Sequence, residues 1–460
     1  MKPGEIVKLD IVGTASDGRG IGKLDTFVVF VHGTLQGDVV LAKIYTVHKT
    51  YATAGVVRII TPSPFRQESF CDASAECGGC PLSHIQYAKQ LKIKRQTVID
   101  ALVRIGGFDL ENVEVAETQG MEQPFGYRNK MVFPIGCKEE KVVGGFYAPK
   151  SHDIIPLATC CVGEEAASKI LDCVVRWMNN RNLAPYDEKK KQGTLRRVFV
   201  RTGYVTKELM VVLSSYTERF PYLEELKQAL LQMDFGEYRL KSIILNVNEK
   251  GNNLVLGEKN ITLWGEDVIY DKLMGLTFSI SPHSFFQINP IQTQVLYQTA
   301  IELARLDSTQ TVLDVYCGIG TISLFAAKHA KQVIGVEIVE SAILNARENA
   351  VQNHVTNATF YCGAAEQIVP KLIADGNRPD VVILDPPRKG SDEKTLSAIL
   401  EAKPQRIVYV SCNPATLARD LRVLAEDGYQ LKTVVPVDMF PHTSHVETVV
   451  LLSKESRDNG

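Results

Sequence analysis

The sequence has no long apolar run, at its start or elsewhere. Hydrophobic residues make up 45% of the 460 residues and charged residues 23%, a balance that is ordinary for a globular protein. No stretch reaches the roughly 20 apolar residues of a membrane-spanning helix, which excludes a transmembrane protein. The first residues, Met1 to Glu5, lack the charged and then apolar pattern of a signal peptide, so we expect a cytoplasmic protein without membrane contact.

The sequence also lacks an excess of charge of one sign. Its formal net charge of −2 does not by itself indicate a nucleic-acid partner, but the local distribution of charge matters more than the sum. The basic residues form two clusters, which are Lys89, Lys92, Lys94 and Arg95, and Lys189, Lys190, Lys191, Arg196, Arg197 and Arg201. A solvated helix or loop face is the default interpretation of each cluster, and a phosphate-binding surface is the alternative.

Internal repeats and low-complexity tracts are absent, and the length allows about three domains of roughly 150 residues each. Short apolar and β-branched runs fill residues 1–60 and predict a small, OB-like β-barrel. We expect its strands at 5–12, 27–31, 38–47 and 55–60, with the glycines from Gly18 to Gly22 in a turn. Residues 61–275 combine a helical pattern at 86–105 with strand-like runs and predict an α+β domain.

Residues 276–460 repeat a pattern of strand, loop and helix. Five apolar runs predict strands, at 311–315, 332–336, 358–361, 380–384 and 406–411. Helical patterns lie between them, for example at 321–330 and 341–353. Apolar strands that alternate with helices predict a parallel sheet with helices on both faces, the doubly wound α/β class.

Polar or glycine-rich segments follow three of these strands, where a doubly wound sheet binds its ligand. Asp314 to Gly320 would let a ligand approach the backbone, and Glu337 follows at the distance that suits ribose hydroxyls. Asp385 precedes two prolines that fix the chain beside the ligand. Because the glycine loop lacks the third glycine of the dinucleotide pattern, we expect S-adenosylmethionine, with NAD or a purely structural loop as alternatives.

Cys412 follows the fifth strand and precedes a predicted helix at 415–424. A helix N-terminus lowers the pKa of a thiol, which matters because only about 3% of an ordinary thiol is ionised at pH 7. The alternative is a buried structural cysteine.

Glu447 begins the last strand, where its carboxylate could act in the cleft; the alternative interpretation is a solvated carboxylate at a strand start. His442 and His445 precede it without a third metal ligand nearby, so we expect structural roles for both.

Together these segments resemble the RNA 5-methyluridine methyltransferase family. The matching motifs are Ser281-Pro282-His283-Ser284-Phe285-Phe286-Gln287, Asp314 to Gly320, Asp385-Pro386-Pro387-Arg388, Ser411-Cys412-Asn413-Pro414 and His445-Val446-Glu447. The resemblance implies that the thiolate of Cys412 adds to carbon 6 of a flipped-out uracil and that Glu447 removes the proton from carbon 5. It implies that S-adenosylmethionine is bound by Gln287, Tyr316, Glu337 and Asp385.

Ten cysteines without an export signal indicate metal ligation, catalysis or burial rather than disulfides. Cys71, Cys77 and Cys80 lie close together and predict a [4Fe–4S] cluster or a zinc site. The family resemblance favours the iron–sulfur cluster and implies Cys161, rather than the adjacent Cys160, as the fourth ligand. No step of the chemistry requires electron transfer, so we expect the cluster to act in folding or RNA positioning.

Residues 1–60 resemble the TRAM-type barrel with which some family members bind RNA. The matching stretches are Asp17 to Lys23, Val29-Phe30-Val31 and Leu35 to Asp38. The first stretch is not a phosphate loop, because Leu24 stands where serine or threonine is required. The barrel and the cysteine motif favour 23S ribosomal RNA over tRNA as the substrate, and we expect a monomer. The alternatives are methylation of a base amine and a non-catalytic RNA-binding protein that senses redox state.

Overall fold

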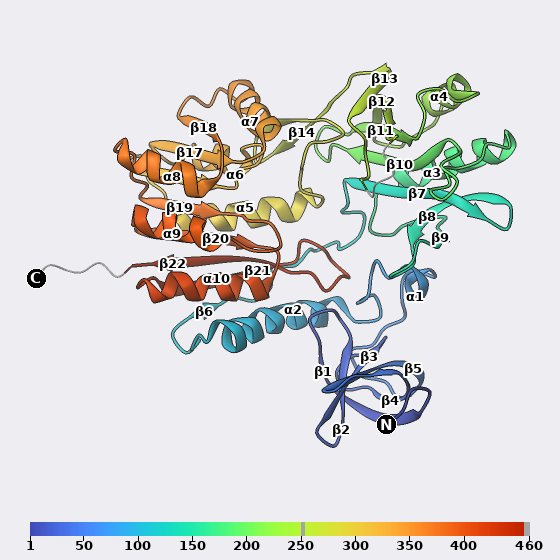
Figure 1. Ribbon diagram of the computed structural model, residues 1–460, viewed down its shortest axis with the longest axis horizontal. Helices are drawn as coiled ribbons and strands as arrows, with labels where there is room; N and C mark the ends of the chain where they lie inside the picture. Colours follow the sequence, from blue (N-terminus) through green and yellow to red (C-terminus); the bar gives the residue numbers. More distant parts are fainter. Residues whose placement is uncertain (250–253, 455–460) are drawn as a thin grey trace, which may run out of the picture.

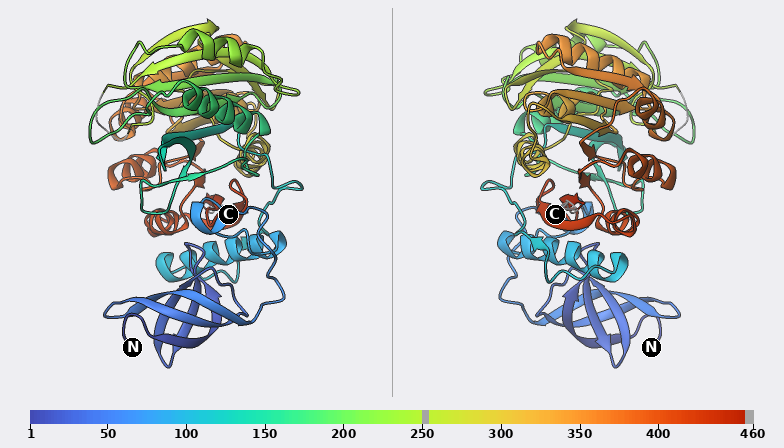
Figure 2. Two further views of the ribbon diagram at one scale, coloured as in Figure 1. Left: turned by 90° about the vertical axis from the view of Figure 1, so that its right-hand side faces the viewer. Right: turned by 90° about the vertical axis from the view of Figure 1, so that its left-hand side faces the viewer.

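A closed barrel forms the N-terminal end of the molecule, as predicted. The structure is a computed structural model that describes residues 1–249 and 254–454. The barrel has the strand order β1-β2-β3-β5-β4, and only β3 and β5 run parallel. Its strands are β1 (Ile6–Thr14), β2 (Gly20–Leu24), β3 (Phe27–His32), β4 (Val39–Val47) and β5 (Tyr51–Thr61). Figures 1 and 2 show the barrel at one end of the molecule, beside helix α2 (Tyr87–Ala101).

Of the segment that we predicted as a glycine turn, Gly18 lies in a turn with φ 88°, whereas Gly20 and Gly22 belong to strand β2. At Gly20 and Gly22, glycine is required by close packing and not by a turn. A Cβ atom on Gly20 would lie 2.0 Å from the hydroxyl of Thr34, and one on Gly22 would lie 3.3 Å from Leu9. The two glycines therefore let β2 cross the barrel core in direct contact with its neighbours.

A mixed sheet of seven strands occupies the middle of the chain, with the order β13-β12-β11-β10-β7-β8-β9. Its strands are β7 (Lys130–Lys138), β8 (Lys141–Tyr147), β9 (Ile154–Pro156), β10 (Leu195–Thr202), β11 (Glu208–Ser215), β12 (Arg239–Val247) and β13 (Lys259–Gly265). Helices α3 (Glu165–Asn180) and α4 (Leu223–Leu231) pack on one face. The opposite face contributes Phe199 and Met210 to the apolar core of the C-terminal domain.

The C-terminal domain is built on an eight-stranded sheet with the order β18-β17-β16-β19-β20-β22-β21-β6. The strands are β16 (Thr311–Val315), β17 (Gln332–Glu337), β18 (Ala358–Cys362), β19 (Val381–Leu384), β20 (Arg406–Ser411), β21 (Gln430–Val437), β22 (Glu447–Ser453) and β6 (Glu114–Val115). The helices are α5 (Pro290–Ala304), α6 (Thr321–Ala326), α7 (Glu340–Gln352), α8 (Ala365–Ala374), α9 (Glu393–Ala402) and α10 (Pro414–Glu426). Strands β16 to β20 are parallel and apolar cores cover both faces, which confirms the doubly wound class.

Parts of the segment that we expected to form a central domain belong to this C-terminal sheet. Strand β6 pairs with β21, and α2 with the π-helical turn η1 (Leu102–Gly106) packs against α10. The hairpin of β14 (Ile269–Leu273) and β15 (Leu276–Ile280) spans the expected boundary at 275/276 and lies in the C-terminal core. Helix α1 (Ser74–Cys77) belongs to the cysteine segment. Within the described residues, no helix is long and apolar enough to cross a membrane.

The basic clusters are only partly solvated, so the default interpretation was wrong for several members. Lys92 and the lysines at 189–191 are exposed, whereas Lys94 is 1% exposed and forms an ion pair with Asp438. Arg196, Arg197 and Arg201 are buried in β10. Their burial depends on strands and loops far away in the sequence, which a local charge pattern cannot reveal.

Candidate active site

A cavity of about 1100 Å³ lies beyond the carboxyl ends of the parallel strands. The loops after β16, β17, β19 and β20, the segment 281–288 and the start of β22 form its walls. All six predicted catalytic and cofactor residues line this one cavity, namely Gln287, Tyr316, Glu337, Asp385, Cys412 and Glu447. Residues from six separate segments are thus brought together, and all except Gln287 lie at strand ends, as predicted.

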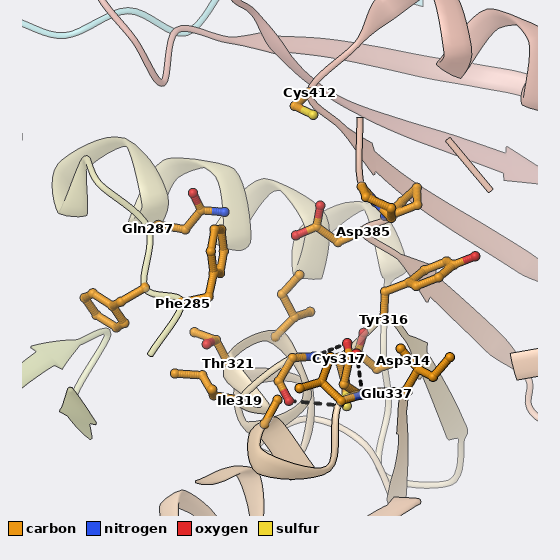
Figure 3. A pocket seen from close by; sticks show the side chains of 18 of the residues that line it. Phe285, Gln287, Asp314, Tyr316, Cys317, Ile319, Thr321, Glu337, Asp385 and Cys412 are labelled. Carbon is orange, nitrogen blue, oxygen red and sulfur yellow. Dashed lines mark hydrogen bonds between the residues drawn. The ribbon is translucent and has the colours of Figure 1, made fainter. Parts of the chain in front are cut away.

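The cavity has two chemically different ends (Figure 3). Cys412 lies at one end, and Glu337 with Cys317 lies at the other. Between them, the carboxylate of Asp385 and the amide of Gln287 point toward each other across the open space. A ligand that fills the cavity would therefore contact carboxylates along its length and the thiol of Cys412 at the end away from Glu337.

The glycine loop holds the end of the cavity that contains Glu337. The carboxylate of Glu337 accepts hydrogen bonds from the backbone N–H groups of Gly318 at 3.3 Å and Val339 at 3.0 Å. Gly320 has φ 80°, and a Cβ atom on this residue would lie 3.0 Å from the ring of Phe360, so only glycine fits this turn. Tyr316 also adopts a left-handed backbone with φ 68°, and its hydroxyl is bonded to Ser391 at 3.0 Å. Such strain is typical of functional sites.

Asp314 and Phe285 lie on the cavity wall, although the sequence analysis gave neither a role of its own. Ser323 donates to one carboxylate oxygen of Asp314, and the other oxygen is buried without a hydrogen-bond partner among the described residues. Burial raises the pKa of Asp314 to about 7. Phe285 is 68% exposed, which is unusual for a phenylalanine. Both residues lie within the matched motifs, and that position was the signal available in the sequence.

The environment of Cys412 opposes ionisation, which corrects the expected effect of the helix. Burial raises the pKa of the Cys412 thiol to about 11, and the carboxylates of Glu447 and Asp385 add to the rise, whereas Arg388 opposes it. Helix α10 begins at Pro414, and Asn413 already caps it by accepting the N–H of Ala415 at 3.0 Å. One of the free N–H groups at the start of the helix is therefore already bonded within the chain and does not face the thiol.

Two carboxylates near the thiol have pKa values close to neutrality. Glu447 is 7% exposed, and burial raises its pKa to about 8, with a further rise from Asp385 and an opposing effect of Arg388. Burial alone raises the pKa of Asp385 to about 7. A carboxylate with a pKa near the working pH is well suited to general-base catalysis, because it takes up and releases a proton readily.

The loop before Glu447 is anchored from outside the C-terminal domain. Lys94 of α2 pairs with Asp438 and donates to the carbonyl of Phe440 at 3.0 Å. The ring of His442 is bonded to the carbonyl of Pro124 at 3.0 Å and to the Gln90 amide at 3.2 Å, which confirms its structural role. His445 is exposed and lines the cavity, with its ring against that of Phe440, and a structural role for it stays a prediction.

Five cysteines gather at one place between the barrel and the central sheet. Burial raises the pKa of Cys80 to about 12, and the charges of Cys160, Cys77 and Cys71 add to the rise. Cys161 is influenced by Cys71, and its thiol lies 3.7 Å from the carbonyl oxygen of Phe70. These five thiols therefore lie near one another, and none of them forms a disulfide bond. Across residues 1–249 and 254–454, however, no three His, Cys, Asp or Glu side chains are arranged to hold a metal ion.

Comparison with known proteins gave matches over the whole chain. The family model described as tRNA (Uracil-5-)-methyltransferase matches residues 221–455, and that of the TRAM domain matches residues 1–57. An uncharacterised RNA methyltransferase of Clostridium tetani is 48% identical over 453 residues, which cover 98% of this chain and 97% of the relative. A counterpart in Clostridium acetobutylicum is 45% identical over 437 residues, which cover 95% and 94%.

One solved structure has the same architecture along nearly the full length. It is the tRNA (uracil-54, C5)-methyltransferase of Pyrococcus abyssi in complex with S-adenosyl-L-homocysteine. The TM-score is 0.77 at 29% sequence identity, and the match covers 97% of this chain and 100% of the other. The barrel, the central sheet and the doubly wound sheet are therefore shared as one arrangement.

Proposed function

This chain belongs to the S-adenosylmethionine-dependent RNA uracil-5-methyltransferase family, and from that premise we propose that it methylates carbon 5 of a uridine in RNA through a covalent adduct on Cys412. The observation that carries the proposal is the arrangement of the cavity. Cys412 and Glu447 share its walls with Gln287, Glu337 and Asp385, and the thiol lies at the end away from Glu337.

In this proposal S-adenosylmethionine supplies the methyl group as an electrophilic sulfonium. Glu337 would bind the ribose hydroxyls, and Gln287, Tyr316 and Asp385 would hold the rest of the molecule. The unpartnered oxygen of Asp314 offers an acceptor to a ligand N–H group at the same wall. The methyl group would then point toward the end that contains Cys412, where the uracil enters.

Cys412 would add to carbon 6 of the uracil, and the electron pair of the 5,6 double bond would move into an enolate that makes carbon 5 nucleophilic. Carbon 5 then takes the methyl group, and S-adenosylhomocysteine remains. Glu447 would remove the proton from carbon 5, and the electrons of that bond would restore the double bond while the sulfur of Cys412 leaves. The target base must be flipped or looped out, which costs a few kcal/mol and least in single-stranded RNA.

The buried carboxylate predicts a pH dependence. With a pKa near 8, Glu447 is largely protonated below that pH and cannot accept a proton from carbon 5. The Cys412 thiol, with a pKa near 11, is also more ionised at higher pH. We therefore expect the single-turnover rate to rise between about pH 6 and pH 9. Rapid-quench measurement of 5-methyluridine at saturating RNA and S-adenosylmethionine tests this, and a rate that falls over the same range would contradict it.

We propose 23S ribosomal RNA as the substrate class, supported by the cysteine motif, since the barrel is shared with a tRNA enzyme and does not distinguish the two RNAs. Transfer RNA is the second candidate, because the Pyrococcus abyssi enzyme with the same architecture acts on uracil 54 of tRNA. Unmodified 23S ribosomal RNA and tRNA would each be incubated with the protein and S-adenosylmethionine, and the nucleosides analysed by mass spectrometry. New 5-methyluridine in ribosomal RNA supports the proposal, whereas its appearance in tRNA alone assigns the second candidate.

We also propose that Cys71, Cys77, Cys80 and Cys161 hold a [4Fe–4S] cluster. Four thiolates are the donor set of such a cluster. Cys71, Cys77 and Cys80 lie within range of one another's charge and Cys161 lies within range of Cys71, whereas Cys160 lies within range of Cys77 and Cys80. The cluster would tie the cysteine segment to the residues before α3. No step of the reaction above passes through it.

The fourth ligand is tested by two matched variants, Cys161→Ser and Cys160→Ser. We expect anaerobically purified wild-type protein to contain about four iron and four sulfide ions per chain. Cys161→Ser should lose most of both, because one thiolate ligand is missing, and Cys160→Ser should retain them. Metal analysis by mass spectrometry measures the iron and zinc content of the wild type and of both variants. Stoichiometric zinc without iron would contradict the cluster, and the reverse pattern in the variants would make Cys160 the ligand.

A further inference from the structure

Three cations meet where the central sheet faces the segment 281–288. Lys130 of β7 and Arg201 of β10 are direct cross-strand partners, so their side chains lie on the same face of the sheet. Arg128 precedes Lys130 by two residues, and its charge acts on Lys130. Like charges directly opposite each other destabilise a sheet, so this arrangement needs an explanation beyond folding.

Arg201 is buried and incompletely bonded. It is 5% exposed, and its Nη2 donates to the carbonyl of Ser284 at 2.5 Å. Its Nε and Nη1 groups, like the Nε group of Arg128, are buried without a hydrogen-bond partner in the part of the chain that the structure describes. Since burying an unpaired charge is costly, such groups are usually satisfied by a carboxylate or a bound anion.

Carboxylates do not balance this cluster. Burial lowers the pKa of Lys130 to about 8, and the charges of Arg201 and Arg128 lower it further. Burial lowers the pKa of Arg201 to about 10. Among the described residues, no ion pair joins Lys130, Arg128 or Arg201 to an acid. Lys130 and Arg128 remain partly exposed, so an anion from outside the protein has access to the cluster.

The cluster is attached to the wall of the active-site cavity. Arg201 bonds the carbonyl of Ser284, directly before the exposed Phe285. Asn129, between Arg128 and Lys130, donates its side-chain amide to the carbonyl of Gln287 at 3.0 Å. Figure 1 shows β7 and β10 side by side in the central sheet, next to the C-terminal domain. The cluster therefore lies directly behind the segment 281–288, which forms one wall of the cavity.

We propose that Arg128, Lys130 and Arg201 form an anion site that binds a backbone phosphodiester of the RNA beside the target uridine. The inference rests on the proposed function, because it takes RNA as the substrate. The partly exposed side chains of Lys130 and Arg128 would contact the phosphate oxygens, and the charge of the buried Arg201 on the adjacent strand would add to the attraction. Its binding would also fix the segment that carries Phe285 and Gln287, through the bonds from Arg201 and Asn129.

The test compares Lys130→Gln with the control Lys138→Gln, which alters the exposed lysine at the other end of the same strand. The probe is fluorescein-labelled decauridylate, and its affinity is measured by anisotropy between about 50 and 200 mM salt. We expect Lys130→Gln to weaken binding roughly tenfold at the lowest salt and to reduce the salt slope by about 0.7, the value for one phosphate on a single strand. Lys138→Gln should match the wild type. Equal affinity and slope in both variants would overturn the proposal.

Arg201→Gln provides a second test of the anion site. If Arg201→Gln fails to fold, the result for Lys130→Gln alone decides between the outcomes. We expect Arg201→Gln to keep its melting temperature, since an unpaired buried charge is removed, and to weaken RNA binding like Lys130→Gln. Calorimetry should show unchanged S-adenosylmethionine affinity in Lys130→Gln, and a parallel loss would assign the site to the carboxylate of that ligand and overturn the proposal. Inorganic phosphate that binds the wild type, with no loss of RNA affinity in Lys130→Gln, would overturn it in favour of the free ion.

Methylation assays on the same preparations separate this inference from the proposed function. We expect the wild-type protein to form 5-methyluridine. Lys130→Gln should raise the KM for RNA more than it lowers kcat. Wild-type turnover together with unchanged RNA binding in Lys130→Gln would overturn the phosphate site alone. Absence of 5-methyluridine with the wild type would overturn the proposed function, while the anisotropy comparison would still decide whether the anion site exists.

Discussion

Replacing Cys412 with alanine is expected to lower methyl transfer by at least about 10⁴-fold, because no other group in the cavity would make carbon 5 of uracil nucleophilic. The thiol lies on the cavity wall beside Glu447, and its high pKa shows that it is not ionised by its surroundings alone. Bound RNA and S-adenosylmethionine, which carries a positive charge, would have to favour the thiolate. The measurement is 5-methyluridine formation in single-turnover reactions with saturating RNA.

Cys317→Ala is the matched control for this experiment. Cys317 is also a cysteine of the cavity wall, but it lies at the opposite end with Glu337. We expect this variant to retain turnover within a few fold, since only a small buried group is removed. S-adenosylmethionine binding should persist in Cys412→Ala. Near wild-type turnover in Cys412→Ala would exclude the covalent adduct and favour direct methylation of a base amine.

Replacing Glu447 with glutamine is expected to trap a covalent complex of protein and methylated RNA. The glutamine keeps the size of the buried side chain but cannot remove the proton from carbon 5, so the sulfur of Cys412 cannot leave. Turnover should fall roughly 10²- to 10⁴-fold, the usual contribution of a general base. A labelled RNA band that migrates with the protein on denaturing gels measures the complex.

Two further variants make this experiment specific. Glu366→Gln changes another carboxylate of the cavity wall and should give no covalent band. Combining Glu447→Gln with Cys412→Ala should abolish the band, because the sulfur is gone. If Glu447→Gln turns over at the wild-type rate without a band, another base acts. Asp385 would then be the first candidate, with its pKa near 7 beside the same thiol.

The parts of the fold that follow from local pattern were predictable from the sequence. The strands of the doubly wound sheet are short apolar runs, and the site residues lie at their ends, so alternation with helices was enough to bring Glu337, Asp385 and Cys412 to one edge. Strand β2 was missed because glycine is a turn signal locally. Glycine is required there for close contact with Thr34, in the loop after β3, and with Leu9 of β1.

The electrostatic properties of the site were not predictable in the same way. The pKa of Cys412 depends on Glu447 and Asp385, which reach the thiol from different strands. Lys94 looked like part of a solvated basic face, and only its pairing with Asp438, 344 residues away, explains its burial. The burial and the pKa of a side chain depend on its tertiary neighbours. A sequence motif indicates which residues lie together, but it does not indicate how polar their surroundings are.

Because β6 pairs with β21, the catalytic domain cannot be transferred to another protein as an independent unit. A fragment that starts at residue 276 would leave the backbone groups of β21 unpaired at an open sheet edge, which invites aggregation. It would also leave Asp438 buried without the cation of Lys94. On the ribosome, the segment with β6 emerges more than 300 residues before β21 and must wait for its partner. New substrate specificities are therefore better engineered by exchanging the barrel than by grafting the catalytic half.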